Sequence, residues 1–204
     1  MISDVSVVRN AVSLLLKRPI TEAIAMQVKA MNGFRHLTIS DGEWDMDRLE
    51  GDIVTTGEQH GWTEALLLTT ITNFVLRYKL GRVYPGDITF VLSGEDADIR
   101  VTREPDIAFV SKARVKSTPG FIYLAPDLAV EIISPSQSYQ EMVAKAHEYF
   151  DYGTKQVWIV LPHDKLIDVY NPDGTFTRYG VADTISGGDL LPGFTLAVAS
   201  IFED

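Results

Sequence analysis

The chain has 204 residues, of which 46% are apolar and 23% charged, and this balance allows a sizeable core and excludes a disordered polymer. It contains no cysteine, which excludes disulfides and thiolate metal sites and fits a reducing cytoplasm, and no apolar run approaches the ~18 residues of a membrane span. Its 28 acidic residues outnumber its 18 lysines and arginines, giving a net charge of −10.

Residues 1–35 are predicted to be mostly helical and to serve in packing or dimerisation, apart from a main domain at 36–204. Apolar residues are dense in this segment, and Pro19 interrupts them. Thr21 is placed to cap a second helix that ends at Gly33.

A loop-rich stretch at 37–47 and a hairpin at 48–54 are expected before the longest helix. Thr55, with Glu58 three residues later, predicts a capping box at the start of this helix, and Gly81 predicts its end. The apolar positions that recur at helical spacing are Leu67, Ile71, Phe74, Val75 and Tyr78.

A further helix is predicted after the long one, from a capping box formed by Ser138 and Glu141, and Gly153 is expected to end it. Asn171-Pro172-Asp173-Gly174 is a turn sequence and predicts a hairpin. This order of elements predicts an α/β (α+β) fold with a mixed sheet flanked by helices. The expected strands are at 82–84, 88–92, 106–110, 128–133, 156–160, 166–170 and 176–179.

Two acidic residues stand where predicted strands begin and end. Asp106 follows Pro105 and opens an apolar run, and Glu131 lies near the end of the run 128–133. Two such strands side by side would bring both carboxylates to one point at the rim of the sheet. Mg²⁺ is held in this way, by one or two carboxylates plus waters and substrate phosphates. An ionised glutamate inside an apolar strand is costly unless it is paired or metal-bound, so Glu131 is a functional candidate by itself.

Several short motifs occur together along the chain, and in this combination the chain resembles the Uma2 family of restriction-endonuclease-like proteins, within the PD-(D/E)XK nuclease superfamily. The resemblance covers roughly residues 45–202. It implies a restriction-endonuclease-like core, a central mixed sheet between helices, and Mg²⁺- or Mn²⁺-dependent cleavage of DNA. The motifs are Pro105-Asp106-Ile107-Ala108-Phe109-Val110, Ala125-Pro126-Asp127 through Glu131 to Ser136, Lys145 ahead of Glu148-Tyr149, Gly153 ahead of Val157-Trp158-Ile159-Val160, and Leu191-Pro192-Gly193-Phe194.

The resemblance also implies roles for particular residues. Asp106 matches the aspartate of the first acidic motif, and Glu131 matches the acid of the second, so both would hold the metal. The lysine expected two residues after Glu131 is replaced by Ile133. Lys145, on the following helix, matches the displaced lysine of this family, since a long side chain on that helix could reach the same point. An ordinary alternative is that Lys145 forms salt bridges on a solvent-exposed helix face.

Four further residues are candidates for an accessory role. Glu58, His60 and Glu64 cluster at the start of the long helix, where an acid could complete a metal site and a histidine could carry a proton. Capping and the helix dipole explain these acids about as well. Asp127 lies on the same strand face as Glu131, but a solvent-facing position at the strand start is the simpler expectation.

The sequence thus predicts a metal-dependent endonuclease that hydrolyses DNA phosphodiester bonds and works as a homodimer. Two alternatives stay open: an inactive nuclease-fold module for binding or assembly, and a hydrolase of another phosphate ester. The net charge of −10 argues against a nucleic acid as the substrate, because proteins that bind nucleic acids usually neutralise the phosphates with a basic surface. A local basic groove assisted by Mg²⁺ would remove this objection. Candidates for such a groove are the basic residues that flank Asp106 in the sequence, namely Arg100, Arg103, Lys112, Arg114 and Lys116.

Overall fold

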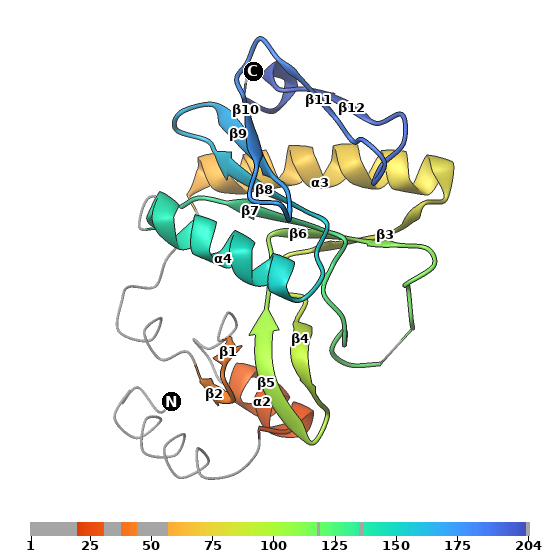
Figure 1. The fold of residues 1–204 in the computed structure, drawn as a ribbon, viewed down its shortest axis with the longest axis vertical. Helices are drawn as coiled ribbons and strands as arrows, with labels where there is room; N and C mark the ends of the chain where they lie inside the picture. Colours follow the sequence, from red (N-terminus) through yellow and green to blue (C-terminus); the bar gives the residue numbers. More distant parts are fainter. Residues whose placement is uncertain (1–19, 31–37, 45–56, 118, 135–136, 203–204) are drawn as a thin grey trace. The chain divides into compact units, whose positions relative to one another are not determined.

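The structure of the protein, a computed structural model, describes residues 20–30, 38–44, 57–117, 119–134 and 137–202 (Figure 1). The chain forms two compact units. The first combines Met1–Ile53, Thr89–Glu104 and Thr118–Leu124, and the second combines Val54–Ile88, Pro105–Ser117 and Ala125–Asp204. The predicted boundary between residues 35 and 36 and the predicted hairpin at 48–54 lie outside the described residues.

The second unit is built on a six-stranded mixed sheet with the strand order β10-β9-β8-β7-β6-β3. β7 and β8 are parallel and are joined through α4, whereas the other neighbouring strands of this sheet are antiparallel. Its elements are α3 (Glu58–Tyr78), β3 (Gly81–Pro85), β6 (Ile107–Ser111), β7 (Leu128–Ile132), α4 (Tyr139–Asp151), β8 (Gln156–Leu161), β9 (Leu166–Tyr170), β10 (Phe176–Tyr179), β11 (Thr184–Ser186), β12 (Thr195–Ala197) and α5 (Ala199–Phe202).

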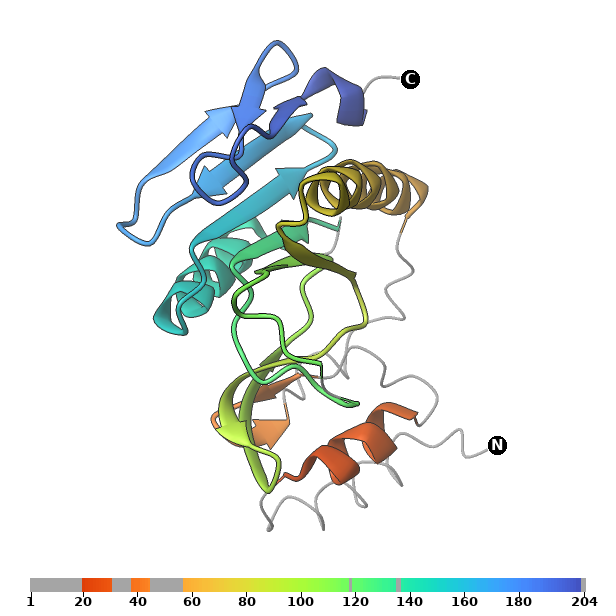
Figure 2. The ribbon, with the colours of Figure 1, turned by 90° about the vertical axis from the view of Figure 1, so that its right-hand side faces the viewer.

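The central strands β7 and β8 are buried because helices cover both faces of the sheet. Successive side chains of a strand point to opposite faces. Val130 and Ile132 pack with Leu67 of α3 in the main hydrophobic cluster, so α3 covers that face. Glu131 points to the other face, where α4 contacts it. Figures 1 and 2 show the strands of this sheet between the two helices.

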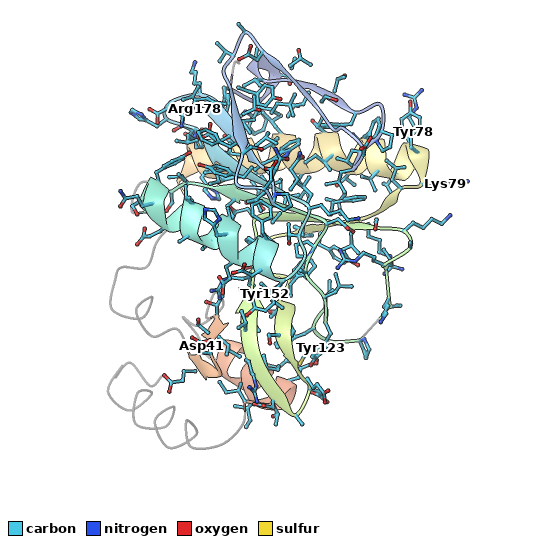
Figure 3. All side chains as sticks on the ribbon, viewed as in Figure 1. Asp41, Tyr78, Lys79, Tyr123, Tyr152 and Arg178 are labelled. Atoms are coloured by element: carbon cyan, nitrogen blue, oxygen red, sulfur yellow. The ribbon has the colours of Figure 1, made fainter. Side chains whose placement is uncertain are left out.

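The two helices differ in how well the sequence predicted their ends. α4 begins with the predicted capping box, in which Ser138 and Glu141 bond to each other's backbone N–H groups. The predicted box at Thr55 is wrong, since Gly57 is the N-cap of α3 and has no side-chain cap. α3 ends at Tyr78 and not at Gly81, and its C-cap, Lys79, adopts a left-handed conformation (φ 54°) at the helix end labelled in Figure 3.

Gly81 has a different role from the predicted one. It is the first residue of β3, and a Cβ added there would lie 2.0 Å from the carbonyl oxygen of Val110 on β6. Only glycine therefore allows β3 to approach β6 this closely.

The first unit contains one helix and two small antiparallel sheets among its described residues. Thr21 caps its helix as predicted, accepting a hydrogen bond from the backbone N–H of Ile24. Glu22 accepts hydrogen bonds from the backbone N–H of Phe121 and from the hydroxyl of Tyr123, which Figure 3 labels. The strand β5 was not predicted, and the expected loop at 37–47 contains a short hairpin. The elements are α2 (Glu22–Ala30), β1 (Ile39–Ser40), β2 (Glu43–Trp44), β4 (Phe90–Glu95) and β5 (Asp98–Arg103).

The predicted hairpin is present as β9 and β10, with Gly174 in its turn at φ 82°. Among the described residues, each helix is too short or too polar to cross a membrane.

Candidate active site

Asp106 stands immediately before β6, next to the end of β7. Ile107 pairs with Val130 in the antiparallel register, so continuing that register by one residue places Asp106 opposite Glu131. The carboxylate of Asp106 accepts a hydrogen bond of 2.6 Å from the backbone N–H of Ile132. The sheet therefore brings the two predicted acids to neighbouring positions on adjacent strands.

Glu131 is held by two side chains of α4. The ammonium of Lys145 lies 3.0 Å from Oε2, and the hydroxyl of Tyr149 donates a hydrogen bond of 2.8 Å to Oε1. Glu131 is only 5% exposed, and Lys145 provides the positive charge that a buried carboxylate requires. The side chain of Lys145 is itself only 19% exposed, so it does not lie on an open solvent face.

Ile133 occupies the position two residues after Glu131 and is half-buried. Its aliphatic side chain offers no charge. The ammonium group beside Glu131 comes instead from α4, which is the displacement that the resemblance implied.

Two residues of α3 lie next to Asp106. Nε2 of His60 is 3.6 Å from Oδ2 of Asp106. Burial acts to lower the pKa of His60, but its contact with Asp106 and the charge of Glu64 outweigh burial, and the pKa is raised. The pKa of Glu64 is also raised, by burial first and by the charge of Asp106 second. Glu58, in the same helical turn as His60, is exposed.

The structure places Asp127 away from this group, at the opposite end of β7. Four residues of strand separate it from Glu131, which corresponds to about 13 Å. The expectation that Asp127 faces solvent is wrong, since it is fully buried (0% exposed). It forms ion pairs with Arg114 (2.8 Å) and Lys155 (2.9 Å).

The pKa of Asp127 is lowered to about 2. Burial acts to raise it, but the hydrogen bond from the backbone N–H of Ser111 and the contacts with Lys155 and Arg114 outweigh burial. Asp127 is therefore a charged residue at the start of the strand, and two ion pairs and a backbone hydrogen bond offset its burial.

A third buried acid, Asp168, was not singled out from the sequence. Asp168 of β9 is fully buried and accepts two hydrogen bonds from Arg178, of 2.8 and 2.7 Å, and one of 2.5 Å from the hydroxyl of Tyr139. Figure 3 labels Arg178 beside β9 and β10. Asp168 and Glu131 both pair with Ile159 across the sheet, so both acids point toward the face that α4 covers.

Tyr149 was also not singled out from the sequence as a site residue, because a tyrosine on the apolar face of a helix usually indicates core packing. The signal was present. Lys145 and Tyr149 are four residues apart and share one face of the helix. A prediction that Lys145 reaches Glu131 therefore places the hydroxyl of Tyr149 within reach of the same carboxylate.

The cations that flank Asp106 in the sequence are divided between the two units. Arg100 pairs with Asp98, and Arg103 donates to the carbonyl oxygen of Thr102, both in the first unit. Arg114 pairs with Asp127 in the second unit. Lys112 and Lys116 are exposed.

The chain shares its fold with a protein whose crystal structure is known. The crystal structure of a putative nuclease belonging to DUF820 from Anabaena variabilis matches 90% of this chain and 98% of its own, with 17% sequence identity and a TM-score of 0.71. The chain is thus a mixed α+β protein with the fold of that structure, a central mixed sheet flanked by helices. The sequence profile of the Uma2 family, described as "Putative restriction endonuclease", matches residues 32–199, and the chain belongs to this family. A comparison with curated proteins gave no match.

Proposed function

We propose that the chain is a metal-dependent endonuclease that hydrolyses phosphodiester bonds of DNA, with its active site at Asp106, Glu131 and Lys145. The observation that carries this proposal is the contact between Lys145 and Glu131. Lys145 of α4 lies 3.0 Å from Glu131 of β7, and Asp106 lies opposite Glu131, immediately before the neighbouring strand β6. Asp106 and Glu131 occupy neighbouring positions in the sheet register at one rim, and Lys145 contacts Glu131 there. Membership of a family described as "Putative restriction endonuclease" supports the same activity.

A divalent ion, Mg²⁺ or Mn²⁺, fits the oxygen donors of Asp106 and Glu131. Among the described residues, no three or more His, Cys, Asp or Glu side chains are grouped so as to hold a metal ion. Two carboxylates are nevertheless enough for Mg²⁺, which keeps several waters and takes its other ligands from substrate phosphate. Bound there, the ion would polarise the phosphoryl oxygen and lower the pKa of a water molecule.

The residues of the chain supply the rest of the chemistry. Asp106 and Glu131 supply negative oxygens for binding, and Lys145 supplies a fixed positive charge that stabilises the charge developing on the phosphoryl group. On α3, His60 contacts the carboxylate of Asp106, and the pKa of Glu64 is raised in part by the charge of Asp106. Both residues are accessory groups in this proposal. Asp127 and Glu58 have no part in it.

DNA as the substrate and a homodimer as the working form belong to the same proposal. Cutting both strands of a duplex is simplest with two sites related by a two-fold axis. The N-terminal segment expected to pair the subunits lies largely outside the described residues. Exposed apolar side chains on α3 provide surface that a second copy could cover, namely Trp62, Leu76 and Tyr78.

Replacement of Asp106 by asparagine tests the proposal. Asparagine keeps the size of the side chain and an oxygen for the N–H of Ile132, but it removes the charge. We expect wild-type protein to cut supercoiled plasmid with Mg²⁺ or Mn²⁺, and Asp106→Asn to lose on the order of 10²-fold or more in rate. His163→Gln, at a side chain that is 95% exposed, is the control and should cut normally. Linear product, as distinct from nicked circles, would support paired sites.

Other outcomes would contradict the proposal. Equal cutting by wild type and Asp106→Asn would exclude this site. Folded wild-type protein that cuts neither duplex nor single-stranded DNA and takes up no Mn²⁺ would favour an inactive binding or assembly module. Metal-dependent hydrolysis of a small phosphodiester without cutting of DNA would favour a hydrolase of another phosphate ester.

A further inference from the structure

Tyr149 is the second side chain that holds Glu131. It lies in the last turns of α4, one helical turn after Lys145, and it is completely buried (0% exposed). Its hydroxyl donates to Oε1 of Glu131 at 2.8 Å, while Lys145 takes Oε2. Each carboxylate oxygen therefore has a different partner.

These two partners differ in how firmly they can fix the carboxylate. The terminal torsion of a glutamate side chain is broad and has no sharp staggered minima, so a carboxylate without a partner rotates freely. Lys145 has a long flexible stem that is partly exposed. The phenol of Tyr149 is enclosed by the core, so its hydroxyl offers the carboxylate of Glu131 a hydrogen-bond donor at a fixed position.

We propose that Tyr149 is a positioning residue of the active site, whose hydroxyl orients the carboxylate of Glu131 for the metal ion and for Lys145. This inference rests on the proposed function. Groups that hydrogen-bond to a metal ligand orient that ligand, and their loss commonly costs about 10- to 100-fold in metal affinity or activity. Tyr149 has the geometry of such a group, because its hydroxyl contacts one oxygen of Glu131 while Lys145 contacts the other.

A purely structural role for Tyr149 makes a different prediction. The hydroxyl could serve only to satisfy a buried acid, as any buried carboxylate requires. The chain offers a matched case on the same helix: Tyr139 donates to Asp168, an acid with no exposure and no part in the proposed site. Removing either hydroxyl should reduce stability, but only one of them should change the binding of metal.

Mn²⁺ affinity, measured by calorimetry on substrate-free protein, separates the two roles. The variants are Tyr149→Phe, Tyr139→Phe and Glu131→Gln, each checked for folding by circular dichroism. We expect Tyr149→Phe to weaken Mn²⁺ binding about tenfold and to lower kcat for plasmid cutting more than it raises KM. Tyr139→Phe should bind Mn²⁺ like wild type, even if its melting temperature falls as much as that of Tyr149→Phe. Glu131→Gln should bind no Mn²⁺.

Each remaining outcome counts against a specific statement. Wild-type Mn²⁺ affinity in Tyr149→Phe, with binding abolished in Glu131→Gln, would overturn the positioning role and leave the proposed function intact. An equal loss of affinity in both tyrosine variants would also overturn it, because the effect would then be structural. Absence of Mn²⁺ binding in the wild type, or unchanged binding in Glu131→Gln, would remove the proposed function and this inference with it.

Discussion

Replacement of Lys145 by methionine is expected to reduce cutting of DNA strongly while leaving in place the two carboxylates that we propose bind the metal. Methionine keeps most of the length of the side chain and removes its charge. Loss of a positive charge that stabilises a transition state costs on the order of 10²- to 10³-fold in kcat. The ammonium of Lys145 lies 3.0 Å from Oε2 of Glu131, where it would compete with the proposed divalent ion for that oxygen. We therefore expect Mn²⁺ to bind more tightly to Lys145→Met than to wild type, measured by calorimetry beside the plasmid assay.

Lys155→Met is the matched control for this experiment. Lys155 also pairs with a buried acid next to β7, Asp127, at 2.9 Å, but at the other end of the strand. Its loss should leave cutting and Mn²⁺ affinity unchanged. Cutting by Lys145→Met at the wild-type rate would show that the contact with Glu131 is an ordinary ion pair. A parallel loss of activity in both variants would show a general effect of removing positive charge.

Replacement of Asp127 by asparagine is expected to destabilise the fold by about 2 kcal/mol at pH 7 without changing the active site. The native pKa of about 2 lies below the ordinary value of 3.8, and that difference corresponds to about 2 kcal/mol. Because the pKa is depressed, this stability is present above about pH 4 and is lost as the pH falls toward 2. Urea unfolding of both proteins should show a difference at pH 7 that narrows steadily between about pH 5 and pH 2.

Asp164→Asn provides the comparison, since Asp164 is exposed and lies in the turn between β8 and β9. It should unfold like wild type across this range. A constant difference between Asp127→Asn and wild type across the whole range of pH would show that the ion pairs with Arg114 and Lys155 do not carry the stability.

The predicted acids were accessible from the sequence because strand alternation and short apolar runs are local signals. Asp106 opens one run and Glu131 lies near the end of another, and antiparallel pairing of β6 with β7 brings them opposite each other. The capping box of Ser138 and Glu141 is equally local, and α4 begins there. The prediction of Lys145 as a site residue rested on the resemblance to the family, since its neighbours along the helix are equally consistent with a solvent-exposed salt bridge.

The sequence predictions were wrong at positions where tertiary contacts determine the structure. Asp127 follows a proline at a strand start, which usually means an exposed turn, but Arg114 and Lys155 come from other segments and compensate its buried charge. Gly81 was taken for a helix stop, although close packing of β3 on β6 requires it and Lys79 ends the helix. Tyr149 indicates core packing because a phenol ring is mostly apolar. Its contact with Glu131 follows only once Lys145, one turn earlier on the same helix, is placed beside that acid.

The central claim is that Asp106 and Glu131 hold one divalent ion. Crystals grown with Mn²⁺ and measured for anomalous scattering test it most directly, because the ion is located without any assumption about the substrate. We predict a single strong peak in contact with both carboxylates, with Tyr149 still bonded to Oε1 of Glu131. A peak elsewhere, or none at saturating Mn²⁺ with Lys145 still paired to Glu131, would contradict the account.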